Sequence, residues 1–197
     1  MRNRLIALGV GIALLLFVGL PLAYLTWPAP VPVSAGGADL QVRYQLRSAQ
    51  SQSVTEQSFA GKWQLVVFGF THCPDICPTT LSTVGQVMDN LGEQASQLQP
   101  LFITLDPQRD TPARLAEYSR FFDPRILGLS GSPMQVRDAA SAFGVYFRKV
   151  PMDTGYTLDH TTTLFLVSPQ GTVQQVFSHS EPAGSITRAV KALLDAR

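Results

Sequence analysis

The chain has two cysteines, Cys73 and Cys77, separated by three residues. They stand where an apolar run of strand length, residues 65–70, gives way to a predicted helix, at the edge where open α/β sheets place their ligands. Backbone N–H groups and the positive end of the helix dipole should lower the pKa of both cysteines. Pro78 suits the first helical turn, so we expect Cys77 at or near the helix cap. This pattern predicts a reactive pair.

The pair by itself allows a structural disulfide, a redox pair or a metal site. A disulfide between Cys73 and Cys77 would remove only about 2 kcal/mol of unfolded-state entropy, a poor device for a domain with a full core. Dithiol oxidoreductases usually have two residues between the cysteines, and here there are three. They also usually carry a proline ahead of the facing strand, whereas residues 157–163 contain His160 and no proline.

A metal site built from Cys73, Cys77 and His160 would have two thiolates and one imidazole. Cu(I) accepts such trigonal coordination, whereas structural zinc would need a fourth protein ligand, which the sequence does not offer. A lone histidine is more often a hydrogen-bonded loop residue. The place of His160 ahead of a predicted core strand, where the chain should pass near the cysteines, favours the ligand role. We therefore predict that these three residues bind one metal ion.

Three other side chains are weaker candidates. His72 adjoins Cys73, but adjacent residues rarely present both side chains to one ion, so we expect it to tune or orient the site. His179 follows a predicted hairpin and is expected in solvent. Met152 has no methionine-rich surroundings and is expected to pack within its loop. None of the three is predicted as a ligand.

Residues 106–112, with the sequence Asp-Pro-Gln-Arg-Asp-Thr-Pro, form a second notable segment. A turn followed by a helix cap accounts for much of it. The alternative is a polar loop beside the cysteines, in which Arg109 orients Asp159 or contacts a partner. Both interpretations stay open. The sequence has no Ser/His/Asp triad, phosphate-binding glycine loop or pair of glycosidase carboxylates.

Apolar patterns predict the elements that position these residues. The run at 65–70 is typical of a strand buried on both faces, and residues 40–46 alternate like an exposed strand or hairpin arm. Further strands are predicted at residues 101–105, 126–129, 145–150, 163–167 and 172–177. Helices are predicted with apolar faces at residues 81–91, 115–122, 136–143 and 186–194. This order predicts an α/β sandwich of thioredoxin type with an N-terminal hairpin.

An uncharged stretch precedes this domain. Residues 5–27 have no charged side chain, and as a helix they would reach about 35 Å, enough to cross a bilayer core of about 30 Å. Arg2 and Arg4 come before the stretch, and no Lys or Arg follows it until Arg43. The positive-inside bias therefore places the tail, residues 1–4, in the cytoplasm. We predict a single transmembrane anchor in a bacterial inner membrane, with the soluble domain in the periplasm.

A linker containing proline and glycine, residues 28–38, is predicted to join the anchor to one soluble domain, residues 39–197. Cleavage near the small residues 33–35 is the alternative to a permanent anchor. The domain has 13 basic and 14 acidic residues, a net charge of −1, and no cluster of Lys or Arg. This balance argues against a nucleic-acid partner. The anchor argues against a soluble cytoplasmic enzyme, and two cysteines are too few for a disulfide-built mini-domain.

Three motifs together resemble the Sco/SenC family. They are residues 68–78 (Phe-Gly-Phe-Thr-His-Cys-Pro-Asp-Ile-Cys-Pro), residues 106–112 and residues 159–161 (Asp-His-Thr). Any one motif is a weak signal, whereas all three in this order are highly specific. The resemblance runs from about residue 40 to residue 197 and includes the single anchor. It implies a membrane-anchored, thioredoxin-like copper protein.

The resemblance further implies that Cys73, Cys77 and His160 bind one copper ion, as Cu(I) and also as Cu(II). It implies delivery of copper to the CuA centre of cytochrome c oxidase subunit II, or reduction of the cysteines of that subunit, and a copper-donor protein is a further expected partner. Asp159 has the family's position beside the histidine, where it would tune or orient that ligand.

Three functions therefore compete. The leading one is a metallochaperone, which binds its cargo without enzymatic turnover. The second is a membrane-tethered thiol–disulfide reductase, an enzyme with Cys73 and Cys77 as its redox pair. A peroxiredoxin-like peroxidase, suggested by residues 70–74, needs one peroxidatic cysteine and leaves His160 without a role. We expect a copper carrier, with oxidoreductase activity as the open alternative.

Overall fold

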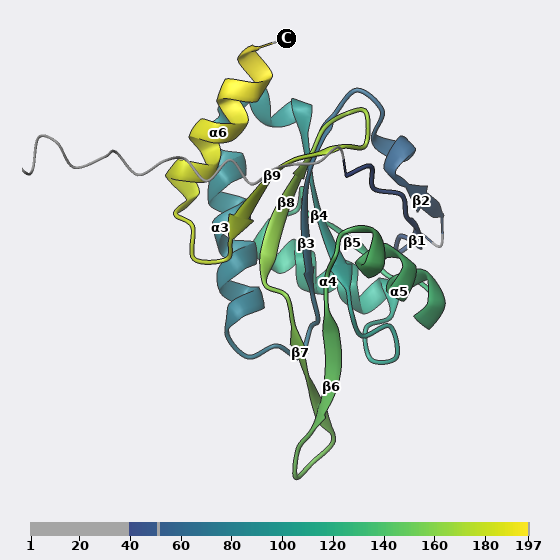
Figure 1. The fold of residues 1–197 in the computed structure, drawn as a ribbon. Helices are drawn as coiled ribbons and strands as arrows, with labels where there is room; N and C mark the ends of the chain where they lie inside the picture. The colour runs from purple at the N-terminus through teal and green to yellow at the C-terminus, as the bar shows by residue number, and fades with distance from the viewer. Residues whose placement is uncertain (1–39, 51, 197) are drawn as a thin grey trace, which may run out of the picture. The chain divides into compact units, whose positions relative to one another are not determined.

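A five-stranded mixed sheet forms the centre of the fold (Figure 1). The structure is a computed structural model and describes residues 40–50 and 52–196. The neighbouring strands, in order across the sheet, are β5 (Leu127–Leu129), β4 (Leu98–Thr104), β3 (Trp63–Gly69), β8 (Thr163–Val167) and β9 (Val173–Ser178). β3 runs parallel to β4 and antiparallel to β8, and β4 runs parallel to β5. This arrangement confirms the predicted α/β sandwich of thioredoxin type.

The central strand β3 is buried along its whole length, as its continuous apolar run predicts. Its side chains alternate between two clusters, because successive residues of a strand point to opposite faces. Leu65 and Val67 belong to one cluster, and Val66 and Phe68 belong to the other. The strand therefore links both hydrophobic cores and fixes the position of the loop that follows it.

Helices cover both faces of the sheet. One face packs against α3 (Ile76–Leu91), α4 (Pro112–Phe122) and α6 (Ala183–Asp195). The other face packs against α5 (Pro133–Ala142) and the N-terminal hairpin of β1 (Gln45–Arg47) and β2 (Ser53–Thr55). Short 3-10 helices, η2 (Glu56–Phe59) and η3 (Gly92–Gln97), precede β3 and β4. The predicted N-terminal hairpin is thus confirmed.

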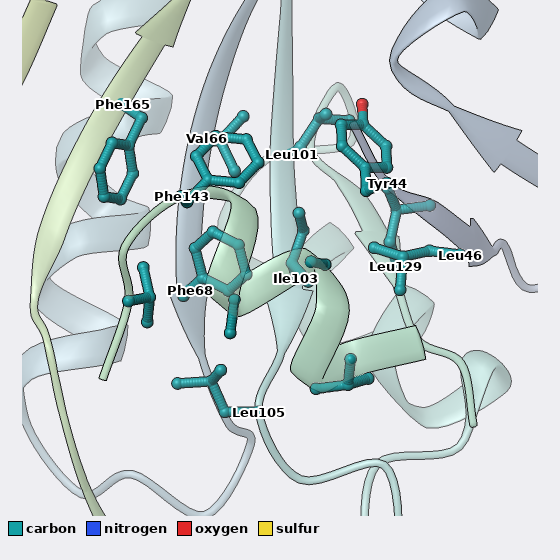
Figure 2. Packing of buried hydrophobic residues seen from close by; sticks show 14 of the residues in the cluster. Tyr44, Leu46, Val66, Phe68, Leu101, Ile103, Leu105, Leu129, Phe143 and Phe165 are labelled. Atoms are coloured by element: carbon teal, nitrogen blue, oxygen red, sulfur yellow. The ribbon is translucent and has the colours of Figure 1, made fainter. Parts of the chain in front are cut away.

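Aromatic rings fill the cluster beneath α5, which Figure 2 shows from close by. Phe68 from β3 and Phe165 from β8 each pack edge-on against Phe143, with ring centroids 5.2 Å apart. Edge-to-face pairs at this distance add to the free energy gained from burial. This packing fixes β3 against β8, the strand that follows His160.

The loops around the site end where three helices, α3, α4 and α5, begin. Thr111 caps α4 and Ser132 caps α5, each accepting a hydrogen bond from a main-chain N–H, as the Thr-Pro and Ser-Pro pairs predict. The helix α3 begins at Ile76 after its cap residue Asp75, so Cys77 is the second helical residue and Pro78 lies in the first turn, in agreement with the expectation that Cys77 stands at or near the cap.

A second hairpin, β6 (Phe147–Pro151) and β7 (Tyr156–His160), extends away from the sheet (Figure 1). Residues 145–150 were predicted as a strand, but its partner β7 was not. Leu158 is the one buried residue of β7, so the segment has little of the apolar pattern by which strands are predicted. His160 is its last residue and lies opposite Phe147.

The predicted tail (residues 1–4), anchor (5–27) and linker (28–38) lie outside the described residues. Within residues 40–50 and 52–196, none of the helices has the length and apolar character needed to cross a membrane.

Candidate metal centre

The two cysteines are free and differ in exposure. Cys73 is half-buried in the loop after β3, whereas the Cys77 side chain is buried under the start of α3. The main-chain N–H of Cys77 donates a hydrogen bond to the Cys73 sulfur, with a distance of 3.4 Å. The first turn of α3 therefore turns a main-chain donor toward Cys73, as expected for a thiolate at a helix start.

Hydrogen bonding shifts the pKa values of the two thiols in opposite directions. The side chain of Cys77 donates to Cys73, and with further hydrogen bonds from His160 and main-chain N–H groups this lowers the pKa of Cys73 to about 3. The same bond to Cys73, together with burial, raises the pKa of Cys77 far above its usual range. The expectation that both pKa values fall was therefore wrong, because the pair shares one proton and Cys77 keeps it.

His160 reaches the cysteines from the end of β7. Its side chain is hydrogen-bonded to Cys73. Its Nδ1 lies 2.8 Å from the carbonyl oxygen of Thr161. Because a carbonyl only accepts, Nδ1 donates there, and Nε2 is the ring nitrogen left for a ligand. Phe70 packs edge-on against the ring, with centroids 5.8 Å apart.

Cys73 thus contacts both Cys77 and His160. In the described part of the chain, no three His, Cys, Asp or Glu side chains are already arranged as a preformed metal cage. The contacts of Cys73 are hydrogen bonds of the metal-free protein. The structure therefore brings the three predicted ligands into one neighbourhood, with the sulfur of Cys73 between the other two.

Gly69, the last residue of β3, makes room for the buried thiol. A Cβ atom on Gly69 would lie 2.6 Å from the Cys77 sulfur and 2.7 Å from the ring of Phe102. Contacts this close do not occur, so only glycine allows the strand, the ring and the sulfur to pack together. Gly69 is not among the site residues predicted from the sequence. A glycine inside an apolar strand run was the available signal, because it indicates close approach of another group.

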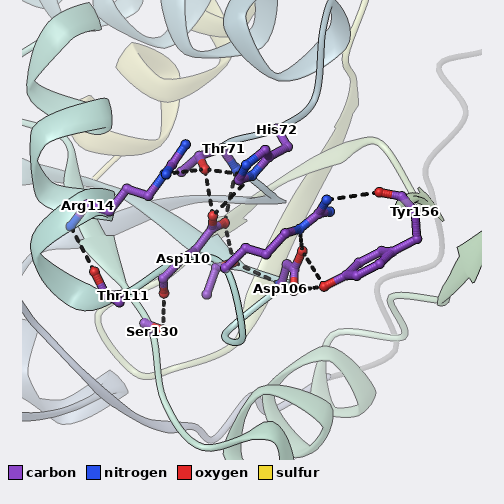
Figure 3. A network of polar contacts seen from close by, with 10 residues as sticks. Thr71, His72, Asp106, Asp110, Thr111, Arg114, Ser130 and Tyr156 are labelled. Atoms are coloured by element: carbon purple, nitrogen blue, oxygen red, sulfur yellow. Dashed lines mark hydrogen bonds and ion pairs between the residues drawn. The ribbon is translucent and has the colours of Figure 1, made fainter. Parts of the chain in front are cut away.

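A buried carboxylate holds the loop that leads to Cys73 (Figure 3). Asp110 accepts hydrogen bonds from the main-chain N–H of Thr71 at 3.0 Å, from its hydroxyl at 2.6 Å and from the hydroxyl of Thr104 at 2.7 Å. The Nδ1 atom of His72 lies 3.9 Å from Asp110. His72 thus faces this network, in agreement with a supporting role. Asp110 was not singled out from the sequence.

Arg109 binds the hairpin rather than Asp159. Its guanidinium contacts the carboxylate of Asp106, donates to the main-chain oxygen of Tyr156 at 2.9 Å and lies 3.9 Å from the centroid of the Tyr156 ring. Of the interpretations that the sequence left open, the one in which Arg109 orients Asp159 is therefore contradicted. Asp159 is exposed and pairs with Arg148 on the neighbouring strand, at 3.0 Å.

Two further expectations need correction. His179 is half-buried, and its Nδ1 lies 3.2 Å from the hydroxyl of Thr162, so it is not simply solvated. Met152 is 59% exposed at the tip of the β6–β7 hairpin, so it does not pack within its loop.

Comparison with known proteins identifies the family of this chain. A family model described as SCO1/SenC matches residues 33–195 of the chain. The chain belongs to the SCO1/SenC family. The family predicted from the three motifs is therefore confirmed.

Relatives of this SCO1/SenC protein include mitochondrial proteins. Protein SCO1 homolog 1 of Arabidopsis thaliana is 35% identical over 159 residues, which cover 80% of this chain and 48% of that protein. The human Protein SCO1 homolog is 35% identical over 151 residues, which cover 75% of this chain and 50% of that protein. The chain thus spans about half the length of the curated relatives it matches.

Two solved SCO1/SenC structures share the fold. Arabidopsis thaliana ScoI with copper bound has a TM-score of 0.75 and 32% identity, and the match covers 80% of this chain and 99% of that one. Bradyrhizobium japonicum ScoI with copper bound has a TM-score of 0.71 and 36% identity, covering 76% of this chain and 96% of that one. These matches confirm the thioredoxin-like fold.

We predict that Gly69→Ala destabilises this SCO1/SenC protein by about 1–3 kcal/mol, because the added methyl group forces the Cys77 sulfur or the Phe102 ring to move. Urea denaturation measures the loss. Gly184→Ala is the control, because its Cβ would meet only the end of the Arg188 side chain, at 4.0 Å, near the start of α6. It should change stability by less than about 1 kcal/mol. Equal losses in both variants would contradict the tight packing around Gly69.

We predict that iodoacetamide alkylates Cys73 at a nearly constant rate between about pH 5 and pH 8. Its folded-state pKa of about 3 lies below the ordinary 9.0, so the nucleophilic thiolate is already formed throughout this range. An ordinary thiol loses about tenfold in rate for each pH unit below its pKa. The Cys77→Ala variant lacks the hydrogen bond that is the largest cause of the low Cys73 pKa. Alkylation of Cys73 in this variant should therefore require a higher pH. A rate in the unmodified protein that climbs tenfold per unit across this range would contradict the prediction.

Proposed function

We propose that this protein is a copper chaperone that binds one copper ion through Cys73, Cys77 and His160. The observation that carries the proposal is the position of the Cys73 sulfur, which is hydrogen-bonded to both other side chains. Two sulfurs and one nitrogen form a soft, low-coordinate donor set that suits Cu(I), and the imidazole also suits Cu(II). The copper-bound ScoI structures, which share the fold and about a third of the sequence, support the same cargo.

Binding would exchange the hydrogen bonds of the metal-free pair for metal bonds. Cys73 is already the thiolate that a metal requires, and Cys77 gives up its proton when the ion arrives. His160 supplies Nε2, because Nδ1 is held by the carbonyl oxygen of Thr161. The hydrogen bond at Nδ1 would also orient the ring toward the ion.

Delivery follows from the unequal exposure of the two sulfurs. Cys73 is half-buried and Cys77 is buried, so an incoming thiolate would approach from the side of Cys73. A three-coordinate Cu(I) accepts a fourth ligand and then releases one of the first three, so the ion passes between proteins without becoming free. The copper stays Cu(I) throughout, and no electron is transferred.

The recipient in this proposal is the CuA site of cytochrome c oxidase subunit II, because Sco-family proteins take part in assembly of that oxidase. We also propose that residues 5–27 anchor the chain in a bacterial inner membrane, so that the soluble domain, residues 39–197, works in the periplasm. An uncharged stretch of this length and the basic residues before it support this placement. A separate donor protein would load the copper.

We predict that the reduced full chain, in detergent and without oxygen, binds close to one Cu(I) per chain in a titration against a chromogenic Cu(I) chelator. Cys73→Ser and Cys77→Ser should abolish tight binding, and His160→Ala should weaken it by about tenfold or more. His179→Ala is the matched control, because it removes a half-buried histidine outside the ligand set. A stoichiometry near zero, or no effect of His160→Ala, would refute the proposed site.

The second candidate function is reduction of the subunit II cysteines. It is favoured by the half-exposed Cys73 thiolate with a thiol beside it. Cys73 would attack a disulfide of the partner and form a mixed disulfide, releasing one partner thiolate. Cys77 would then attack the Cys73 sulfur and release the second, so that the partner is reduced and the Cys73–Cys77 pair oxidised. A reductant from another thiol protein would restore the pair.

We predict that cells complemented with His160→Ala lose CuA, because the imidazole is needed to hold copper, whereas thiol exchange needs only the two sulfurs and His160 is one of the lesser causes of the low Cys73 pKa. The CuA content of the purified oxidase, read from its absorbance, measures this loss. Cys73→Ser should give the same loss. Normal CuA content with His160→Ala, together with its loss in the cysteine variant, would instead identify the reductase.

A further inference from the structure

Arg109, Asp106 and Tyr156 form one contact between the loop after β4 and the β6–β7 hairpin. Figure 3 labels Asp106 and Tyr156 on the two sides of this contact. The Asp106 carboxylate is buried and receives the Arg109 guanidinium and the Tyr156 hydroxyl, which lies 2.9 Å and 3.2 Å from its two oxygens. The guanidinium also binds the main-chain oxygen of Tyr156 at 2.9 Å and stacks on its ring. Arg109 and Asp106 therefore hold both the main chain and the side chain of Tyr156.

We propose that these three residues are a latch that positions His160 beside the Cys73 sulfur. The proposal rests on the function proposed above and assigns positioning residues to the same site. None of the three is a ligand. They act through the hairpin, because Tyr156 and His160 are the first and last residues of the same strand, β7.

Outside the latch, the hairpin is attached by Lys149, whose Nζ donates to Gln108 at 2.6 Å, and by Phe147 and Leu158, which pack against the cluster beneath α5. Within its two strands, Leu158 is the only buried residue, and the two strands pair with each other rather than with the five-stranded sheet. An isolated two-stranded hairpin is marginally stable in water, so its orientation depends on what holds it to the body of the protein. The latch supplies that hold at the outer end of β7, and Phe147 lies opposite His160 at the inner end.

The latch is also connected to the cysteine loop. The Arg109 guanidinium lies 5.9 Å from the centroid of the Phe70 ring, and that ring is fully buried and packs against the ring of His160. Phe70 comes directly after β3 and accepts a hydrogen bond at its carbonyl from the N–H of Cys73, at 3.2 Å. Arg109 therefore contacts both the strand that ends at the histidine and the residue that leads to the cysteines.

Tyr156→Phe tests the latch with the smallest change, because it removes the hydroxyl whose single hydrogen bond is shared by the two Asp106 oxygens and keeps the ring under Arg109. Cu(I) affinity of the full chain should fall roughly tenfold, the loss expected for a hydrogen bond to a charged group. Tyr146→Phe is the matched control, since it removes the same hydroxyl from a tyrosine that is 61% exposed just before β6. It should leave the affinity unchanged.

A thermodynamic cycle separates positioning from a general loss of stability. Tyr156→Phe is also made in the His160→Ala background, where two thiolates still bind Cu(I) weakly. If the latch acts through His160, the tenfold effect disappears in that background. The same loss in both backgrounds, or no loss in either, would overturn the proposal.

A second measurement needs no copper and keeps the two proposals distinguishable. In the metal-free chain, Tyr156→Phe should speed amide hydrogen exchange in residues 156–160 several-fold, whereas Tyr146→Phe should not. If the unmodified chain binds no Cu(I), the proposed function fails, and exchange alone then decides whether the latch holds the hairpin. Unchanged exchange in Tyr156→Phe would refute the latch even if copper binds as proposed.

Discussion

The buried carboxylate of Asp110 organises the edge of the sheet on which the whole site depends. It accepts hydrogen bonds from Thr71, which follows β3, and from Thr104, the last residue of β4. Its main-chain oxygen accepts a hydrogen bond from Ser130, which follows β5. One residue thus joins the carboxyl ends of the three parallel strands. Because a buried carboxylate is costly unless it is hydrogen-bonded, these loops have one favoured arrangement. The loop that starts at Thr71 leads to Cys73, so this arrangement also fixes where the cysteines lie.

The two sides of the candidate site are held with different strength. On one side, the cysteines lie between β3, which joins both hydrophobic clusters, and the first turn of α3. On the other side, His160 lies on a hairpin outside the five-stranded sheet, which is held by the contact of Arg109 with Tyr156, by the Lys149–Gln108 hydrogen bond and by a few packed side chains. Local opening has the lowest free-energy cost where few buried contacts are lost. The hairpin that carries the histidine is therefore the side of the site that we expect to open at the lower free-energy cost, a property that the proposed carrier role would use.

The features that the sequence predicts are those set by short-range rules. The apolar run predicts β3, and the Thr-Pro pair at Thr111 predicts the start of α4, because burial and capping act over a few residues. Strand β7 was missed because its pattern is weak and Leu158 alone is buried. The partner of Arg109 stayed open because Tyr156, which it contacts, is 47 residues away and binds through its ring and main chain. The unequal cysteine pKa values depend in the same way on tertiary structure, first on the hydrogen bond between the two thiols and then on the burial of Cys77, neither of which the spacing reveals.

The β6–β7 hairpin is also the part of the molecule that best separates the two candidate functions. Thiol–disulfide exchange needs two sulfurs, and Cys73 and Cys77 would suffice for it without any contribution from the hairpin. Ordering a protruding hairpin costs conformational entropy, and the contacts of Arg109 with Tyr156 offset part of that cost. What this ordering achieves locally is to bring one imidazole, that of His160, against the Cys73 sulfur. A third donor atom completes a site for a soft metal ion, whereas thiol–disulfide exchange gains from the imidazole only one of the lesser causes of the low Cys73 pKa, so this architecture fits the proposed carriage of copper better than it fits the reductase.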